Sequence, residues 1–100
     1  MNILDFQKEV LEDNIFFSEH AVRRMAKRDI SDDDVVEAIL SGEIIEEYPE
    51  DKYSPSCLIF GETKDKRLLH IVCSLPPRVR IITVYQPDPD EWIDNRRRKK

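Results

Sequence analysis

The chain has 100 residues, of which 40% are hydrophobic and 37% are charged, and its formal net charge is −5. This length suits one folded domain and excludes two. The hydrophobic content excludes a disordered chain, and the presence of only two glycines excludes a glycine-rich phosphate-binding loop. Because nucleic-acid-binding domains are usually basic, the acidic total argues against a non-specific binder of duplexes.

The apolar stretches of the sequence are strand-sized, and none of them follows a basic start. The sequence therefore predicts neither a secretory signal nor a membrane-spanning segment, and the expected location is the cytoplasm. The two cysteines, Cys57 and Cys73, are expected to be reduced there. Together with two histidines they lack the spacing of a zinc site, so no metal and no cofactor is expected.

The first third of the chain has helical periodicity. Residues 3–12 carry apolar side chains at helical spacing, and the short apolar run 15–17 indicates at most one edge strand. Ser18 is a good N-cap for a helix over residues 19–28. At 100° per residue, this helix has an apolar face and a polar face. The apolar face consists of Ala21, Val22, Met25 and Ala26, and the polar face consists of His20, Arg23, Arg24 and Lys27.

A third helix is predicted after Ser31, with acidic residues in its first turn, where they suit the positive end of the helix dipole. Gly42 stands where a left-handed C-cap is expected. Beyond it the apolar period changes from helical to alternating. Four strands separated by turn-forming residues are predicted: Ile44–Tyr48, Cys57–Gly61, Leu68–Ser74 and Val79–Tyr85.

This order of elements predicts an α+β domain, with two or three N-terminal helices packed on one face of a four-stranded antiparallel meander sheet. We expect a single domain over residues 1–95, with Trp92 packing a final turn back onto the body. Residues 96–100 are all basic and are expected to form a disordered tail. Such a tail could contact RNA or an acidic partner, or simply solubilise the end of the chain.

Turn lengths predict the register of the strands. A three-residue loop at 64–66 predicts three cross-strand pairs: Cys57 with Cys73, Ile59 with Ile71, and Phe60 with His70. A tight turn at 76–77 places His70 opposite Thr83. Because side chains alternate along strands, the sheet face that meets the helices should carry Cys57, Ile59, Leu69, Ile71, Cys73, Ile82 and Val84. The other face should carry Phe60, Glu62, His70, Thr83 and Tyr85.

Two groups of residues have the chemistry for RNA cleavage. Cleavage without a metal needs a base for the 2′-hydroxyl, an acid for the leaving oxygen and cations for the charge on the phosphate. The polar face of helix 19–28 supplies a histidine and three cations, although a solvated helix face gives the same pattern. On the sheet, His70 can act as acid or base, and Tyr85 can donate a proton or stack on a base. The alternative there is an ordinary sheet surface with a partly buried histidine.

Four separated motifs resemble one family. They are FSEHAVRRMAKRDIS at 17–31, GEIIEEYP at 42–49, LHIV at 69–72 and ITVY at 82–85. Over nearly the whole domain, these residues resemble the domain-of-unknown-function family four-two-five-eight, which is grouped with the RelE and barnase-like ribonuclease toxins. The resemblance implies the compact RelE/barnase-like α+β fold, an RNA-cleaving activity and a cognate antitoxin protein as partner. The polar positions that match the family are His20, Arg24, Arg28, His70 and Tyr85.

The leading hypothesis is a metal-independent endoribonuclease of a toxin–antitoxin pair. In this hypothesis His20 or His70 is the general base or acid, and Tyr85 donates a proton or stacks. The phosphate is held by Arg24 together with Arg23, Lys27 or Arg28. The alternative is a non-catalytic interaction domain that binds RNA or an acidic protein through the basic helix, and a third reading is a structural remnant without a ligand. One departure from the family, Asp29 in place of a glycine, concerns the end of the helix.

Overall fold

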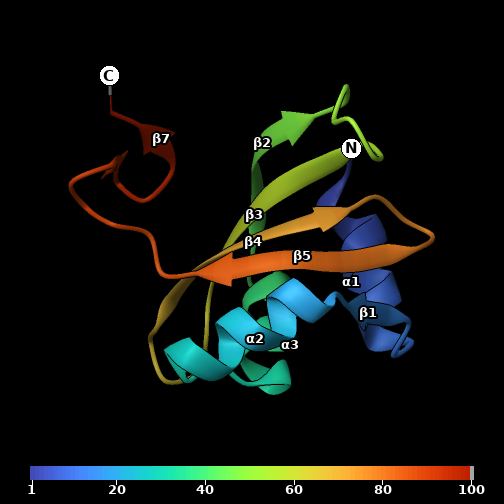
Figure 1. Ribbon diagram of the computed structural model, residues 1–100, viewed down its shortest axis with the longest axis horizontal. Coiled ribbons are helices and arrows are strands. Elements are labelled where there is room, and N and C mark those ends of the chain that lie inside the picture. The colour runs from blue at the N-terminus through green and yellow to red at the C-terminus, as the bar shows by residue number, and fades with distance from the viewer. Residues whose placement is uncertain (100) are drawn as a thin grey trace.

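A computed structural model describes residues 1–99 of the chain (Figure 1). Three helices precede most of the strands, and a small hairpin follows the sheet. The helices are α1 (Ile3–Leu11), α2 (Glu19–Arg28) and α3 (Asp32–Leu40). The strands are β1 (Ile15–Phe17), β2 (Glu43–Tyr48), β3 (Ser56–Glu62), β4 (Leu68–Ser74), β5 (Val79–Tyr85), β6 (Trp92–Ile93) and β7 (Arg97–Arg98). The class is therefore α+β, as the sequence predicts.

Side-chain caps explain where the helices begin. The Ser18 hydroxyl accepts a hydrogen bond from the Ala21 amide at 3.0 Å, so α2 begins at the predicted residue. At α3, Ser31 and Asp34 form a reciprocal capping box, in which each side chain accepts from the other residue's amide. Such caps satisfy amides that have no partner within the helix, and each stabilises it by about 1 kcal/mol.

The sheet has five strands, in the order β1-β5-β4-β3-β2, and it is mixed. Its four meander strands pair antiparallel as predicted, but β1 adds a fifth strand that runs parallel to β5. The predicted four-stranded antiparallel sheet is therefore wrong at this edge. The physical reason is that α2 and α3 follow β1 and carry the chain across one sheet face, which is the long connection that parallel neighbours require.

The predicted register is confirmed for one hairpin and wrong for the next. In β3 and β4, Cys57 lies opposite Cys73 and Phe60 lies opposite His70. Between β4 and β5, however, His70 lies opposite Tyr85 instead of Thr83, and the register shifts along the strand pair. This irregularity turns Ile81 into the core in place of the predicted Ile82.

Two serines account for that second register. The Ser18 amide donates to the carbonyl of Ile81 at 3.0 Å, and the Ser18 hydroxyl donates to the next carbonyl, of Ile82, at 3.2 Å. At the turn, the Ser74 hydroxyl accepts from the Arg80 amide at 2.9 Å. The two serine hydroxyls thus bond a carbonyl and an amide of β5, and the pairing of β5 with β4 contains an irregularity that accommodates an extra residue.

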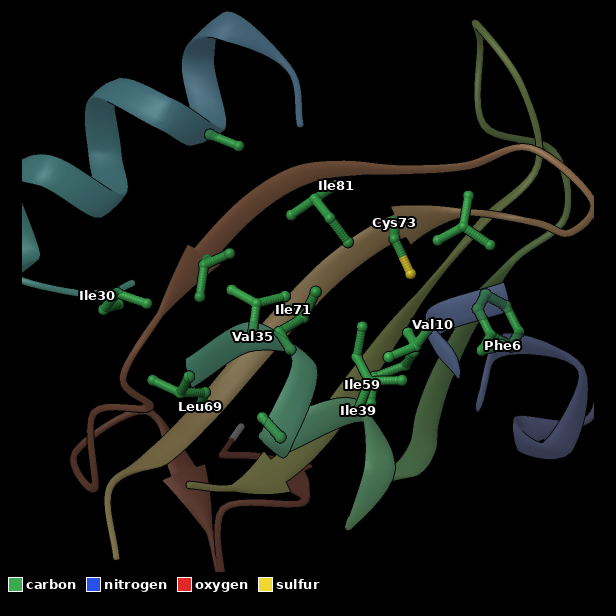
Figure 2. Packing of buried hydrophobic residues seen from close by; sticks show 14 of the residues in the cluster. Phe6, Val10, Ile30, Val35, Ile39, Ile59, Leu69, Ile71, Cys73 and Ile81 are labelled. Atoms are coloured by element: carbon green, nitrogen blue, oxygen red, sulfur yellow. The ribbon is translucent and has the colours of Figure 1, made fainter. Parts of the chain in front are cut away.

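The main hydrophobic core lies between the three helices and one face of the sheet (Figure 2). The predicted core residues Cys57, Ile59, Leu69, Ile71, Cys73 and Val84 all belong to it. The apolar face of α2 is narrower than predicted, because only Ala21 and Met25 are buried and Val22 is 54% exposed. Its partner in the sheet is β5, which has only the short strand β1 beyond it, so a single stripe of the helix is covered.

Close packing of α3 on β3 depends on glycine. A Cβ atom on Gly61 would lie 1.7 Å from the carbonyl oxygen of Ala38, and one on Gly42 would lie 2.6 Å from the same atom. Neither glycine has a positive φ. The predicted left-handed C-cap at Gly42 is therefore wrong: α3 ends at Leu40, its C-cap is Ser41, and Gly42 is required for space.

The chain end folds back instead of extending away. Strand β7 pairs with β6, and two residues with positive φ, Asp94 and Asn95, form the turn between them. The expectation of a disordered basic tail covered residues 96–100; Lys100 lies outside the described residues, and the structure places residues 97 and 98 in β7. Within residues 1–99, no helix has the length and apolar character that crossing a membrane requires.

Candidate functional site

The sheet face away from the helices carries a row of three ring side chains. Phe60, His70 and Tyr85 are direct cross-strand neighbours on β3, β4 and β5. The His70 ring meets both neighbours edge to face, with centroid distances of 5.8 Å to Phe60 and 5.2 Å to Tyr85. The structure therefore brings together the two predicted site residues of the sheet.

His70 is fully buried, with 0% of its surface exposed. Its Nε2 lies 2.6 Å from the carbonyl oxygen of Asn95, and its Nδ1 lies 3.3 Å from the hydroxyl of Tyr85. A carbonyl oxygen can only accept, so Nε2 carries the proton and Nδ1 accepts from Tyr85. Burial lowers the pKa of His70 below its ordinary value and raises that of Tyr85, so both are neutral at pH 7.

The segment over residues 87–99, which we call the C-terminal cover, lies over this row. The Trp92 ring packs edge to face on His70 at 4.4 Å, and only 3% of Trp92 is exposed. The Arg96 guanidinium lies 4.9 Å from the centre of the Phe60 ring, and Arg98 lies 4.6 Å from that of Trp92. The cover therefore shields His70 from solvent, whereas Tyr85 is only half-buried.

Carboxylates of β2 hold the cover in place. Arg96 pairs with Glu43 at 2.5 Å, and Arg98 pairs with Glu46 at 3.0 Å. Glu46 also accepts from the hydroxyl of Tyr48. Burial raises the pKa of the Glu46 carboxyl, but the bonds from Tyr48 and Arg98 outweigh burial and lower it overall. Burial and the bond to Glu46 raise the pKa of Tyr48 to about 12.

The second candidate region is the basic face of α2, formed by His20, Arg23, Arg24 and Lys27. All four side chains are exposed. None of the ion pairs and side-chain hydrogen bonds found within residues 1–99 involves them. The helix supplies their arrangement, because residues three and four apart share one side. This face is an uncompensated cluster of positive charge on an acidic protein.

The two regions are separate in the structure. No hydrogen bond or ion pair among the described residues joins the basic face to His70 or Tyr85. Arg28 comes nearest to linking them: it is half-buried at the end of α2, and its Nη1 donates to the Val84 carbonyl at 2.6 Å, one residue before Tyr85. Its positive charge acts to lower the pKa of Tyr85, against the larger effect of burial.

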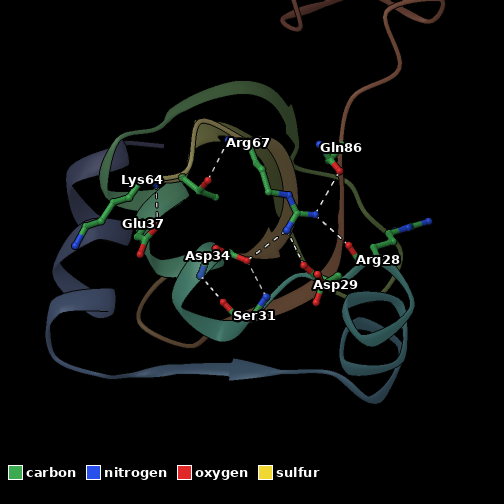
Figure 3. A network of polar contacts seen from close by, with 9 residues as sticks. Arg28, Asp29, Ser31, Asp34, Glu37, Lys64, Arg67 and Gln86 are labelled. Atoms are coloured by element: carbon green, nitrogen blue, oxygen red, sulfur yellow. Dashed lines mark hydrogen bonds and ion pairs between the residues drawn. The ribbon is translucent and has the colours of Figure 1, made fainter.

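Arg67, which sequence reasoning missed, anchors the end of α2 (Figure 3). Its guanidinium donates to the carbonyls of Asp29 at 2.6 Å and Arg28 at 3.0 Å, and it pairs with Asp34 at 3.6 Å. Asp29 is the helix C-cap, with φ 54° and ψ 48° in the left-handed region. Nothing in the hairpin sequence around Arg67 signals these distant carbonyl partners.

A cleft of about 880 Å³ lies between α3, the end of β3 and Arg96 of the cover. Its walls carry both signs of charge and include Asp33, Glu37, Glu43, Glu62, Lys64, Lys66 and Arg96. In the part of the chain that the structure describes, no group of three or more His, Cys, Asp or Glu side chains is placed to hold a metal ion. Because its charges are mixed, this cleft selects neither anions nor cations.

Comparison with protein families gives a match over most of the chain. The family described as "Domain of unknown function (DUF4258)" matches residues 17–86. The chain belongs to this family. Searches of curated proteins and of solved structures return no match. The DUF4258 match includes the basic face, His70 and Tyr85, and it leaves out both α1 and the C-terminal cover.

Proposed function

We propose that this DUF4258 domain is a metal-independent endoribonuclease of the RelE/barnase-like toxin type, with a cognate antitoxin protein as its partner. The observation that carries the proposal is the hydrogen-bonded His70–Tyr85 pair. A neutral histidine with an accepting nitrogen, beside a protonated phenol, gives a base and an acid in one place.

The basic face of α2 supplies the binding surface for RNA. The molecule carries a net charge of −5, so most of its surface repels a polyanion. The four basic-face side chains are exposed and lack acidic partners among residues 1–99. Phosphate contacts from such cations position a nucleic acid without reading its sequence. In this proposal the RNA backbone binds the basic face of α2, and the chain passes the edge of β5 at Arg28 to reach His70 and Tyr85 on the opposite face of the sheet.

The proposed reaction is attack of a ribose 2′-oxygen on the adjacent phosphorus. His70 takes the proton from the 2′-hydroxyl, the new O–P bond forms, and the bond from phosphorus to the 5′-oxygen breaks. Tyr85 gives its proton to the departing 5′-oxygen. Arg28, whose guanidinium lies beside β5 at Val84, stabilises the charge that develops on the phosphate.

A second candidate is the non-catalytic interaction domain, and the burial of His70 favours it. Both ring nitrogens of His70 are engaged, and the side chain is 0% exposed. In this candidate the basic face of α2 binds RNA or an acidic protein, and His70 only stabilises the sheet. The two candidates share the binding surface and differ in whether the bound RNA is cut.

The test combines binding and cleavage of single-stranded RNA in the presence of EDTA. We expect the wild type to cleave, and His70→Gln to retain RNA binding through the basic face but to cleave about 10²–10⁴-fold more slowly. Arg24→Glu should weaken binding, whereas the matched control Arg78→Glu, an exposed arginine outside α2, should change it far less. Binding without cleavage would establish the second candidate, and the absence of both activities would refute the proposal.

A further inference from the structure

The C-terminal cover begins where the DUF4258 match ends. The match stops at residue 86, and the cover spans residues 87–99. Yet the cover buries side chains that lie inside the matched domain: His70 is 0% exposed and Phe60 is 9% exposed. The sheet face of the matched domain is therefore occupied by a segment outside it.

The groups that the cover places on this face resemble the parts of a nucleotide. The indole of Trp92 lies against the His70 ring as a flat aromatic group at 4.4 Å. The carbonyl oxygen of Asn95 accepts from His70 Nε2 at 2.6 Å. A nucleobase offers a flat ring for such a contact, and a phosphate or base carbonyl offers the accepting oxygen.

We propose that the face formed by Phe60, His70 and Tyr85 is a nucleotide-binding site, and that the C-terminal cover occupies it until RNA displaces the cover. The choice of RNA as ligand rests on the proposed function. In the closed state, Trp92 takes the place of the base and the Asn95 carbonyl takes the place of an accepting oxygen.

The cover is held by contacts that can be broken without unfolding the domain. The main hydrophobic cluster contains no residue from 87–99. The ion pair of Arg96 with Glu43 is half exposed on both sides, and a pair this exposed contributes little. In the second pair Arg98 is 60% exposed and Glu46 is 22% exposed. Strands β6 and β7 have two residues each, and an isolated two-stranded hairpin is marginal in water.

RNA has a specific advantage in displacing this segment. Arg96 and Arg98 are bound to the carboxylates of Glu43 and Glu46 in the closed state. A phosphate backbone competes with these carboxylates for the same guanidinium groups, and arginine binds both through the same geometry. A nucleic acid therefore attracts the cover's arginines while its base enters the place of the indole.

Trp92 is the only tryptophan of the chain, so its fluorescence reports the state of the cover. The full chain is titrated with a labelled single-stranded oligouridylate, whose anisotropy reports binding, while Trp92 emission is recorded. We expect emission to shift to the red as RNA binds, and Glu46→Gln should lower the RNA concentration that is needed several-fold. Saturated RNA binding with unchanged emission would overturn the inference and leave RNA binding by α2 intact.

Inorganic polyphosphate separates charge competition from nucleotide binding. This polymer has the phosphates of RNA but no bases, so we expect it to shift Trp92 emission far less than RNA at equal charge. An equal shift with polyphosphate would overturn the nucleotide site, because the cover would then respond to charge alone.

A second experiment does not depend on RNA binding by α2. Trp92→Ala removes the indole that takes the place of the base in the proposed site. Binding of adenosine monophosphate is then followed by the NMR signals of the His70 ring. We expect at least tenfold tighter binding in Trp92→Ala than in wild type, and no gain in Tyr53→Ala, which removes a ring that is 90% exposed. Equal binding by Trp92→Ala and wild type would refute the site, whatever α2 binds.

Discussion

The basic face of α2 and the His70–Tyr85 pair have opposite physical characters. The basic face is exposed and its charges have no partners among the described residues. His70 is buried, neutral and hydrogen-bonded through both ring nitrogens. Exposed charges without partners add little to folding, whereas a buried and fully hydrogen-bonded ring stabilises the fold. Variants should therefore separate stability from binding.

The largest expected effect is on stability at His70. His70→Ala removes a ring that touches Phe60, Tyr85 and Trp92 and leaves a buried carbonyl without its donor, so it should destabilise the protein by about 2–4 kcal/mol. Arg24→Ala should change stability by less than about 0.5 kcal/mol. Urea unfolding measures both. Equal small losses of stability would show that the His70 face is open in solution and contributes no more to folding than the basic face.

Arg67 should have the next largest effect, because it fixes the position of the basic helix. Arg67→Ala removes the donor to two helix-end carbonyls and the ion pair with Asp34, and should cost about 1–3 kcal/mol. Arg67→Lys should recover only part of this, since an ammonium cannot reproduce the planar fork. Thermal unfolding with NMR of the α2 amides checks the loss. If Arg67→Lys had the full stability of the wild type, only the positive charge of Arg67 would be needed and its planar geometry would not.

Asp29 offers a smaller and opposite effect at the same helix end. Its φ of 54° lies in the left-handed region, which glycine adopts without steric cost. Asp29→Gly should therefore stabilise the protein by about 0.5–1 kcal/mol, and RNA binding by the basic face should be unchanged or slightly stronger because a negative charge is removed. A loss of stability would mean that the Asp29 side chain contributes to the cap.

The two regions also differ in how their contribution to the free energy of unfolding depends on pH. Burial lowers the pKa of His70 below its ordinary 6.5, so on acidification the unfolded chain takes up a proton before the folded protein does. Its contribution to stability is therefore complete above pH 6.5 and decreases as pH falls below that value. Urea unfolding between pH 8 and pH 5 should show a steeper loss for wild type than for His70→Gln. Parallel slopes would mean that His70 protonates freely in the folded state.

Local patterns explain which parts of this fold the sequence could predict. Ser18 and Ser31 gave the helix starts, and the loop at 64–66 gave the pairing of Phe60 with His70, because caps and short turns act over a few residues. The pairing of His70 with Tyr85 could not be predicted in the same way. It depends on Ser18 binding the carbonyls of β5, a contact between residues 64 apart.

Predictability differed between the two candidate regions for the same reason. The basic face follows from helical spacing alone, so its four residues could be named in advance. The alternation of side chains along the strands places His70 and Tyr85 on one sheet face, but it does not predict how deeply they are buried. The burial of His70 comes from Trp92 and Asn95, more than twenty residues further along the chain, and the acceptor is a backbone carbonyl that no side-chain pattern reveals.

The free thiols of Cys57 and Cys73 can report the opening of the hydrophobic core. Both side chains are 0% exposed and lie opposite each other. The hydrogen bond from Cys57 and burial raise the pKa of Cys73, so it remains a thiol and is a poor nucleophile. Because both side chains belong to the core between the helices and the sheet, a thiol reagent can label these cysteines only when the helices separate from the sheet. Labelling kinetics would then give the opening free energy of the core, independently of movements of the segment that covers His70.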